Sequence, residues 1–202
     1  PSFGQMSARG AMPCSQALDQ PGVFARSVAD AAFLASNLTA QRTAITPEVR
    51  PLRNGPKLAA VRSPVWHLAQ PAQRMQFEAD IARLREAGAS VDVLEIAGEF
   101  DGAHKVHRTI MLYEAARLAK KAREIWRGGF SDFLNKALDE GENIREADYR
   151  EALKVRGQLQ QSLAEFFDRG YSAIVTPPAA GEAPATRENT GDPRFCTIWT
   201  LV

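Results

Sequence analysis

The chain contains serines, histidines and cysteines, but none of them stands in a motif that activates a nucleophile. A Gly-x-Ser-x-Gly elbow, which exposes a serine on a strand-to-helix turn, does not occur in the sequence. Ser7 has glycines nearby in the stretch GQMSARG, yet no pattern of strand, turn and helix surrounds it. Because an activated serine also needs a positioned base, we expect no catalytic residue within these 202 residues.

Two histidines have a spacing that suits a metal ion. His104 and His107 lie three residues apart in a predicted helix, so both face the same side. A zinc site needs at least one further protein ligand, and none lies nearby in the sequence. We therefore predict no metal site and no cofactor, and we interpret both histidines as solvated or helix-capping side chains.

Composition and charge exclude several classes of function. The 25 Lys and Arg residues almost balance the 24 Asp and Glu residues, which leaves a formal charge of +1. Nucleic-acid-binding proteins carry a clear basic excess, so we expect no nucleic-acid partner. No apolar run approaches the roughly 18 residues of a membrane helix. Because Cys14 and Cys196 show no metal or redox spacing, we predict a cytoplasmic protein with two free, buried thiols.

A helix is predicted directly after a loop of residues 1–26. Ser27 is a suitable N-cap, and Asp30 lies in the first turn, where a carboxylate meets free N–H groups. Arg26 lies four residues before Asp30, so we expect an ion pair at the start of this helix. The predicted apolar stripe consists of Val28, Ala31, Ala32, Ala35 and Leu38.

Residues 57–96 predict a strand, a helix and a second strand. The apolar stretch KLAAVR (57–62) predicts a buried strand, after a linker over residues 41–56. Pro71 suits the first turn of the helix, and Gly88 suits its C′ position. Alternation at Val91 and Val93 predicts a half-buried strand over residues 89–96. This order favours a parallel pair of strands with a right-handed crossover.

Helices dominate the second half of the sequence. Helical patterns cover residues 100–126 and 130–141, and Asn143 with Glu146 forms a capping-box pattern for a long third helix. The stretch YSAIVTP (171–177) predicts a strand, and residues 179–194 predict an exposed loop. Two sheet units with helices between them predict an α/β core with an inserted helical layer.

Two stretches of the chain follow a known family pattern. Pro1, Ala17-Leu18-Asp19, Gly22, Arg26 and Asp30-Ala31-Ala32 follow the order of a Lys-Pro strand and a Ser-Leu-Asp-x-x-Gly-Pro-x-x-Arg-x-x-x-Asp-Ala-Ala run. Tyr171 to Pro177 then match a Tyr-Asp-x-Leu-x-Thr-Pro strand behind a long helix. In both stretches, and over nearly its whole length, the chain resembles the part of amidase signature hydrolases that follows the nucleophile.

The resemblance implies a fold and a reaction. The fold would be α/β, with a mixed sheet covered by helices, and residues 1–202 would form a single partial domain of three parts, 1–99, 100–170 and 171–202. The reaction would be cleavage of an amide C–N bond through a serine acyl-enzyme. In the family a neutral Lys is the base, a Ser in a cis peptide relays the proton and a second Ser attacks. These residues would precede Pro1, so we expect residues 1–202 alone to be inactive.

Four residues are candidates for substrate binding. The resemblance places Asp19 near the active-site loops, where accepting backbone N–H bonds is the competing structural role. Thr176 ends a predicted strand, and ligands bind at the carboxyl ends of strands in open α/β sheets. Phe195 and Trp199, in the apolar run FCTIWTLV, would line an acyl pocket beside Thr176. The competing interpretation of both aromatic residues is that they belong to the core.

Other functions stay open at this point. The chain could be a non-catalytic scaffold, a transferase with an amine acceptor, or the ammonia-releasing subunit of a tRNA-dependent amidotransferase. In that subunit a short helix carries paired arginines, one of which helps to hold an amino-acid carboxylate, whereas residues 133–137 contain only Lys136. The partners that we expect are a small-molecule amide and the remainder of the same polypeptide, with a homodimer as an open alternative.

Overall fold

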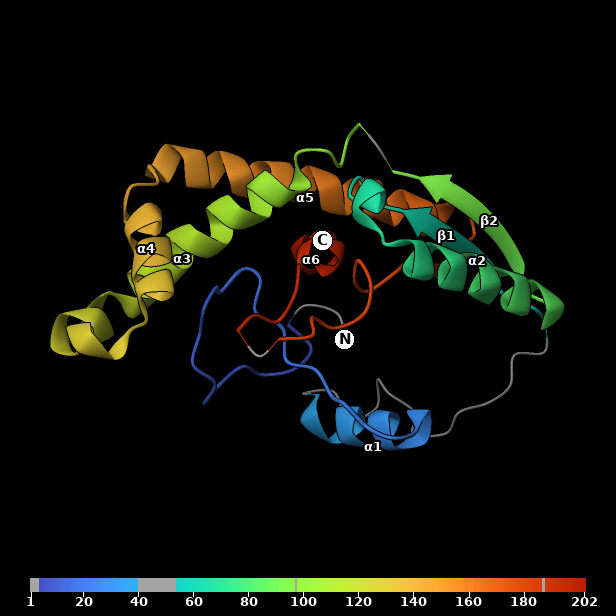
Figure 1. The fold of residues 1–202 in the computed structure, drawn as a ribbon, viewed down its shortest axis with the longest axis horizontal. Helices are drawn as coiled ribbons and strands as arrows, with labels where there is room; N and C mark the ends of the chain where they lie inside the picture. Colours follow the sequence, from blue (N-terminus) through green and yellow to red (C-terminus); the bar gives the residue numbers. More distant parts are fainter. Residues whose placement is uncertain (1–3, 40–53, 97, 187) are drawn as a thin grey trace. The chain divides into compact units, whose positions relative to one another are not determined.

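The structure is a computed structural model that describes residues 4–39, 54–96, 98–186 and 188–202. These residues contain six α-helices, three short strands and two single-turn 3-10 helices, Trp66–Leu68 and Arg127–Gly129 (Figure 1). Most of the linker expected over residues 41–56 lies outside these residues. Among the described helices, none combines the length and the apolar composition that crossing a membrane requires. The chain divides into a first unit, 1–51 with Ile110–Ile144, and a second unit, 52–109 with Arg145–Val202.

The second unit contains a parallel sheet. Strands β1 (Lys57–Arg62), β2 (Ser90–Glu95) and β3 (Ala173–Val175) lie in the order β2-β1-β3, and both pairs are parallel. Helix α2 (Pro71–Glu86) connects β1 to β2, so the predicted βαβ unit is confirmed, as is the α/β class. A central parallel strand is buried on both faces, which explains why the four interior residues of β1, from Leu58 to Val61, are all apolar and buried. The core cluster between this sheet and α2 contains Leu58, Ala60, Phe77, Ile81 and Val91.

Two glycines allow α2 to turn back into the sheet. Gly88 follows the C-cap Ala87 of α2 and has a φ of 92°, a left-handed conformation that favours glycine. A Cβ atom on Gly55 would lie 1.6 Å from the carbonyl oxygen of Gly88. Both positions therefore require glycine, Gly88 for its backbone angle and Gly55 for lack of space.

Helices α5 (Glu146–Asp168) and α6 (Arg194–Leu201) complete the second unit. The capping box predicted at Asn143 and Glu146 is wrong, because the N-cap of α5 is Arg145 and no side chain caps it. Asn143 instead ends the preceding helix, where its side-chain amide donates to the carbonyl oxygen of Asp139 at 2.8 Å. The apolar run after residue 194 folds as α6, which buries Phe195, Ile198 and Leu201.

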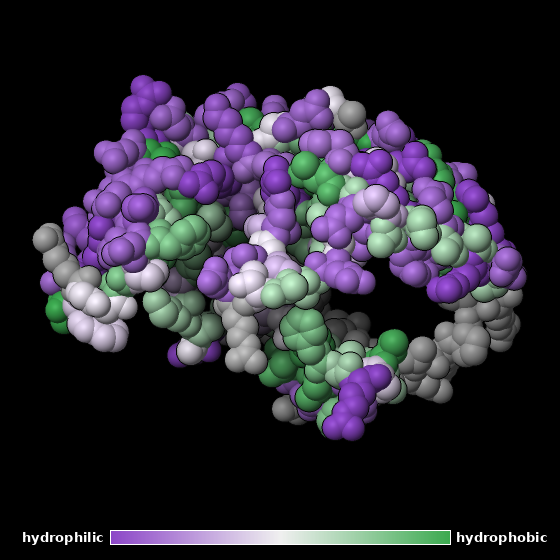
Figure 2. Space-filling view, viewed as in Figure 1, coloured by the Kyte–Doolittle hydropathy of each residue, from purple (hydrophilic) through white to green (hydrophobic). Residues whose placement is uncertain are grey.

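The first unit contains α1 (Val28–Leu38), most of α3 (Ala103–Ile125) and α4 (Asp132–Glu142). Ser27 caps α1 as predicted, accepting a hydrogen bond from the Asp30 N–H at 3.1 Å. The predicted Arg26–Asp30 ion pair is not among the ion pairs of the described residues. The apolar stripe is also wrong in its burial, because only Ala35 is buried and Val28 is 71% exposed. Figure 2 shows hydrophobic residues gathered over α1, at the bottom of the view.

One polar contact in the second unit has a measurable consequence. The Tyr171 hydroxyl donates to an Asp92 carboxylate oxygen at 2.8 Å, and the Lys57 ammonium lies 4.2 Å from the centre of the Tyr171 ring. The hydrogen bond to Asp92, desolvation and the negative charge of Asp92 together raise the pKa of Tyr171.

We expect Asp92→Ala to lower the pKa of Tyr171 towards its ordinary value of about 10. Because the pKa is raised in the folded chain, the contact contributes stability that is complete below this ordinary value and is lost as the pH rises through the folded pKa. Ultraviolet titration of tyrosinate measures the shift, and Tyr171→Phe identifies which of the three tyrosine signals belongs to this residue. An unchanged titration in Asp92→Ala would contradict the assigned cause.

Candidate functional site

Asp19 closes a short loop of residues 14–19, called here the Asp19 loop. One of its carboxylate oxygens accepts hydrogen bonds from the backbone N–H groups of Cys14 at 2.7 Å and Ser15 at 3.0 Å. The Asp19 N–H in turn donates to the carbonyl oxygen of Ser15 at 2.8 Å. The carboxylate thus accepts backbone N–H bonds, which is the structural role that the sequence analysis named beside substrate contact.

A buried carboxylate from a distant helix holds the same loop. Glu114, on α3, is 8% exposed and accepts a hydrogen bond from the Ser15 hydroxyl at 2.5 Å and from the Ala17 N–H at 3.0 Å. Our sequence interpretation missed Glu114. A signal was present, because Glu114 lies four residues after Ile110 and so shares the apolar face of this helix.

The Asp19 loop borders a hollow of about 280 Å³, which is lined by Ala8, Ala11, Met12, Pro13, Asp19, Gln20 and Pro21.

Cys14 and Cys196 are both free and exposed, which corrects the prediction of buried thiols. Desolvation and the negative charges of Asp19 and Glu114 raise the pKa of the Cys14 thiol. The thiol therefore reports on the electrostatics of this loop.

In the second unit, hydroxyl groups lie at the carboxyl edge of the sheet. Thr176 follows β3 directly, and Ser63 follows β1. Both hydroxyl oxygens are buried without a hydrogen-bond partner among the described residues, and so is the indole nitrogen of Trp199. Ser63 was not among the predicted site residues, since a lone serine after a strand carries no distinctive signal.

Phe195 and Trp199 lie one turn apart on α6, but their environments differ. Phe195 is 1% exposed and packs in a core cluster with Val65 and Ala69, as the competing core interpretation held. The Cys196 thiol donates to the carbonyl oxygen of Pro178 at 3.0 Å, so α6 contacts the segment behind Thr176. The second unit therefore contains three of the four predicted residues, whereas Asp19 belongs to the first unit.

The histidine pair has an ordinary structural environment. The ring Nε2 of His104 donates to the carbonyl oxygen of Arg194 at 2.9 Å, which ties α3 to the start of α6. Burial and the neighbouring His104 lower the pKa of His107. Within the described ranges, His, Cys, Asp and Glu side chains form no group of three or more that could hold a metal ion.

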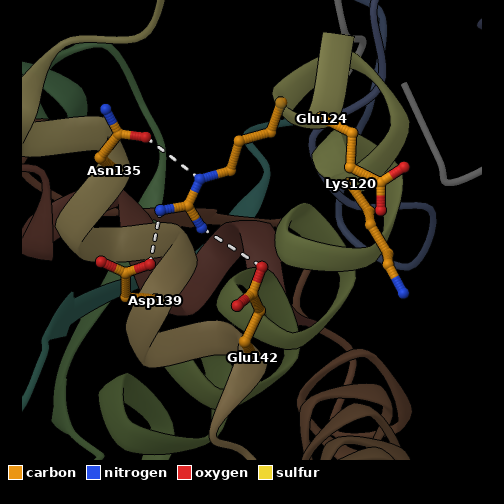
Figure 3. A pocket seen from close by; sticks show the side chains of 6 residues that line it. Lys120, Glu124, Asn135, Asp139 and Glu142 are labelled. Carbon is orange, nitrogen blue, oxygen red and sulfur yellow. Dashed lines mark hydrogen bonds and ion pairs between the residues drawn. The ribbon is translucent and has the colours of Figure 1, made fainter. Parts of the chain in front are cut away.

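A charged hollow of about 420 Å³ lies between α3 and α4 (Figure 3). Its centre is Arg123, whose guanidinium donates to Asn135 at 3.1 Å, to Asp139 at 2.5 Å and to Glu142 at 3.2 Å. Figure 3 shows Lys120 and Glu124 pointing away from this guanidinium. Asp139 and Glu142 are thus both engaged by a positive charge of the chain itself, so we interpret the cluster as a link between the helices.

Comparisons with known proteins agree over the whole chain. A family model described as Amidase matches residues 1–201. The A subunit of the glutamyl-tRNA(Gln) amidotransferase from Koribacter versatilis (strain Ellin345) is 25% identical, over 96% of this chain and 47% of that protein. A crystal structure described as an amidase has a TM-score of 0.80 and 29% identity, and the match covers 100% of this chain and 47% of that one.

The likeness extends to more distant structures, for which it shows the fold alone. The crystal structure of the corresponding A subunit of glutamyl-tRNA(Gln) amidotransferase from Thermotoga maritima has a TM-score of 0.69 and 21% identity, over 100% of this chain and 46% of that one. The chain spans about half the length of the relatives that it matches. With an α/β fold and a family match from residue 1 to residue 201, the chain belongs to the amidase signature family.

Proposed function

We propose that this chain is part of an amidase that hydrolyses an amide C–N bond through a serine acyl-enzyme. The observation that carries the proposal is the family match over residues 1–201, together with a coverage of only about half of each relative. The attacking serine, the relay serine and the base lysine then lie upstream of Pro1, within the same cytoplasmic polypeptide. Residues 1–202 form one partial domain of that enzyme.

In this proposal Thr176 and Trp199, in the second unit, shape the substrate chamber. Thr176 and Trp199 each have a buried polar atom without a partner among the described residues, so they supply hydrogen bonds to a bound acyl group. Phe195 is buried in the core cluster with Val65 and Ala69, so it supports α6 rather than contacting the substrate. Asp19 lies in the Asp19 loop, and its hydrogen bonds set the shape of the hollow that it borders. The substrate is a small-molecule amide.

The second candidate is the ammonia-releasing subunit of a tRNA-dependent amidotransferase. It is favoured by the name of the curated relative at 25% identity. The short helix α4 argues against it, because residues 133–137 offer only Lys136 where that subunit carries paired arginines. A simple amide is therefore the substrate that we favour over glutamine.

The proposal predicts activity that depends on sequence outside this chain. We expect the product of the complete gene to release ammonia or an amine from simple aliphatic and aryl-acyl amides, and to release less ammonia from glutamine. A serine-directed acylating reagent should label a peptide that precedes Pro1. A label within residues 1–202, or turnover by purified residues 1–202 alone, would contradict the proposal.

Thr176→Val tests the chamber directly. Valine keeps the shape of threonine and removes its hydroxyl group, so we expect the KM for the preferred amide to rise about three- to tenfold, as for one lost hydrogen bond. Thr200→Val is the matched control, because Thr200 lies on the exposed side of α6 and its hydroxyl donates to the carbonyl oxygen of Cys196. An equal KM in both variants would remove Thr176 from the site.

A further inference from the structure

Two carboxylates hold the Asp19 loop, and only one of them belongs to the loop. Asp19 accepts the N–H groups of Cys14 and Ser15, while Glu114 accepts the Ser15 hydroxyl and the Ala17 N–H. Ser15 takes part in both sets of hydrogen bonds and is 1% exposed. The two carboxylates are therefore coupled through a single buried residue.

Glu114 provides the contact between this loop and a rigid element. It lies within the long helix α3, and its contacts to Ser15 and Ala17 span 99 and 97 residues of sequence. Taking a carboxylate out of water is unfavourable unless hydrogen bonds compensate for the lost solvation. The loop supplies such hydrogen bonds, so Glu114 and the loop fix each other's geometry.

We propose that Glu114 is a positioning residue, which holds the Asp19 loop and thereby sets the orientation of the Asp19 carboxylate at the border of its hollow. Without the Glu114 carboxylate, the buried Ser15 hydroxyl and the Ala17 N–H both lose their hydrogen-bond acceptor. The loop then has to open towards water to satisfy these donors, which moves Cys14, Ser15 and Asp19 together. The inference rests on the proposed function only in giving Asp19 a place in an amide site.

Amide hydrogen exchange on the 202-residue chain tests this coupling. In Glu114→Ala, we expect the Ala17 N–H to lose protection directly. We also expect the N–H groups of Cys14 and Ser15 to exchange about tenfold faster or more, although their acceptor Asp19 is unchanged. Glu114→Gln, which keeps an acceptor oxygen, should restore all three protection factors to within about twofold. A merely local role would affect Ala17 and leave Cys14 and Ser15 as they were, and that result would overturn the proposal.

The pH dependence of Cys14 alkylation provides a second measurement. It is made in a Cys196→Ser background, where Cys14 is the sole thiol of the chain. Glu114→Gln removes a negative charge that raises the pKa of Cys14, so the pH midpoint of its alkylation should fall. Glu124→Gln is the matched control, since Glu124 is an exposed carboxylate of the same helix, and it should change neither the midpoint nor the exchange rates. An unchanged midpoint in Glu114→Gln would contradict the placement of the Glu114 carboxylate beside the Asp19 loop.

The outcomes separate this inference from the proposed function. Exchange and alkylation require no turnover, so positioning by Glu114 can hold even where the complete gene product hydrolyses no amide. If Glu114→Ala does not fold, Glu114→Asp takes its place, because its carboxylate is one methylene group shorter and cannot make the same contacts. Unchanged protection of Cys14 and Ser15 in that variant would refute the proposal equally.

Discussion

Phe195→Ala is expected to lower the free energy of unfolding by about 3–5 kcal/mol, the usual cost of removing a buried phenylalanine ring. Phe195 is 1% exposed and packs against Val65 and Ala69, with Trp66, Leu68 and Ala180 around this cluster. The loss combines the transfer free energy of the ring with the cavity that remains. Urea unfolding, followed by far-ultraviolet circular dichroism, measures the effect.

The matched control is Phe133→Ala, in which the same side chain is removed from an exposed position on α4. Phe133 is 85% exposed, so the change in unfolding free energy should stay within about 0.5 kcal/mol. Similar effects in the two variants would contradict the placement of Phe195 in the core. They would favour the interpretation of Phe195 as a side chain available to a ligand.

The second large effect is expected at Gly141, where α4 crosses α3. A Cβ atom at this position would lie 2.1 Å from the carbonyl oxygen of Leu112 and 2.9 Å from the Cβ atom of Ala116. The first of these atoms belongs to helical backbone and cannot move alone, so α3 and α4 would have to separate. Gly141→Ala should therefore destabilise the chain by about 1–3 kcal/mol or more, which thermal unfolding would show as a lower Tm.

Gly157→Ala, inside helix α5, is expected to change the stability in the opposite direction. Gly157 lies inside α5, and a Cβ atom there would meet no other atom within 4 Å. Alanine should stabilise the chain by about 0.5–1 kcal/mol, because glycine loses more backbone freedom on folding. The two substitutions are chemically identical, so opposite signs assign the difference to the helix crossing. A stabilising Gly141→Ala would show that the crossing is looser than described.

Local signals were sufficient for most of the secondary structure. The Ser27 cap, the proline at the start of α2 and Gly88 behind it mark helix ends through hydrogen bonds and backbone angles within a few residues. The run KLAAVR predicted β1 because a central parallel strand is apolar on both faces. The capping box at Asn143 and Glu146 failed because Asn143 bonds back to Asp139 and ends α4 instead. A residue between two helices can cap either the end of the first or the start of the second, and the sequence pattern does not distinguish these two roles.

The sequence by itself determined the α/β class, the order of the strands and helices as far as β3, and the resemblance to amidase signature enzymes, because these depend on local spacing and on motifs. Only the tertiary structure decided that Glu114 anchors the Asp19 loop, that Phe195 is buried in the core, and that Gly141 has no room for a side chain. The physical reason is that each of these features is a contact between distant segments. The free energy of such a contact depends on which atoms the fold brings together, and no spacing within one segment encodes it.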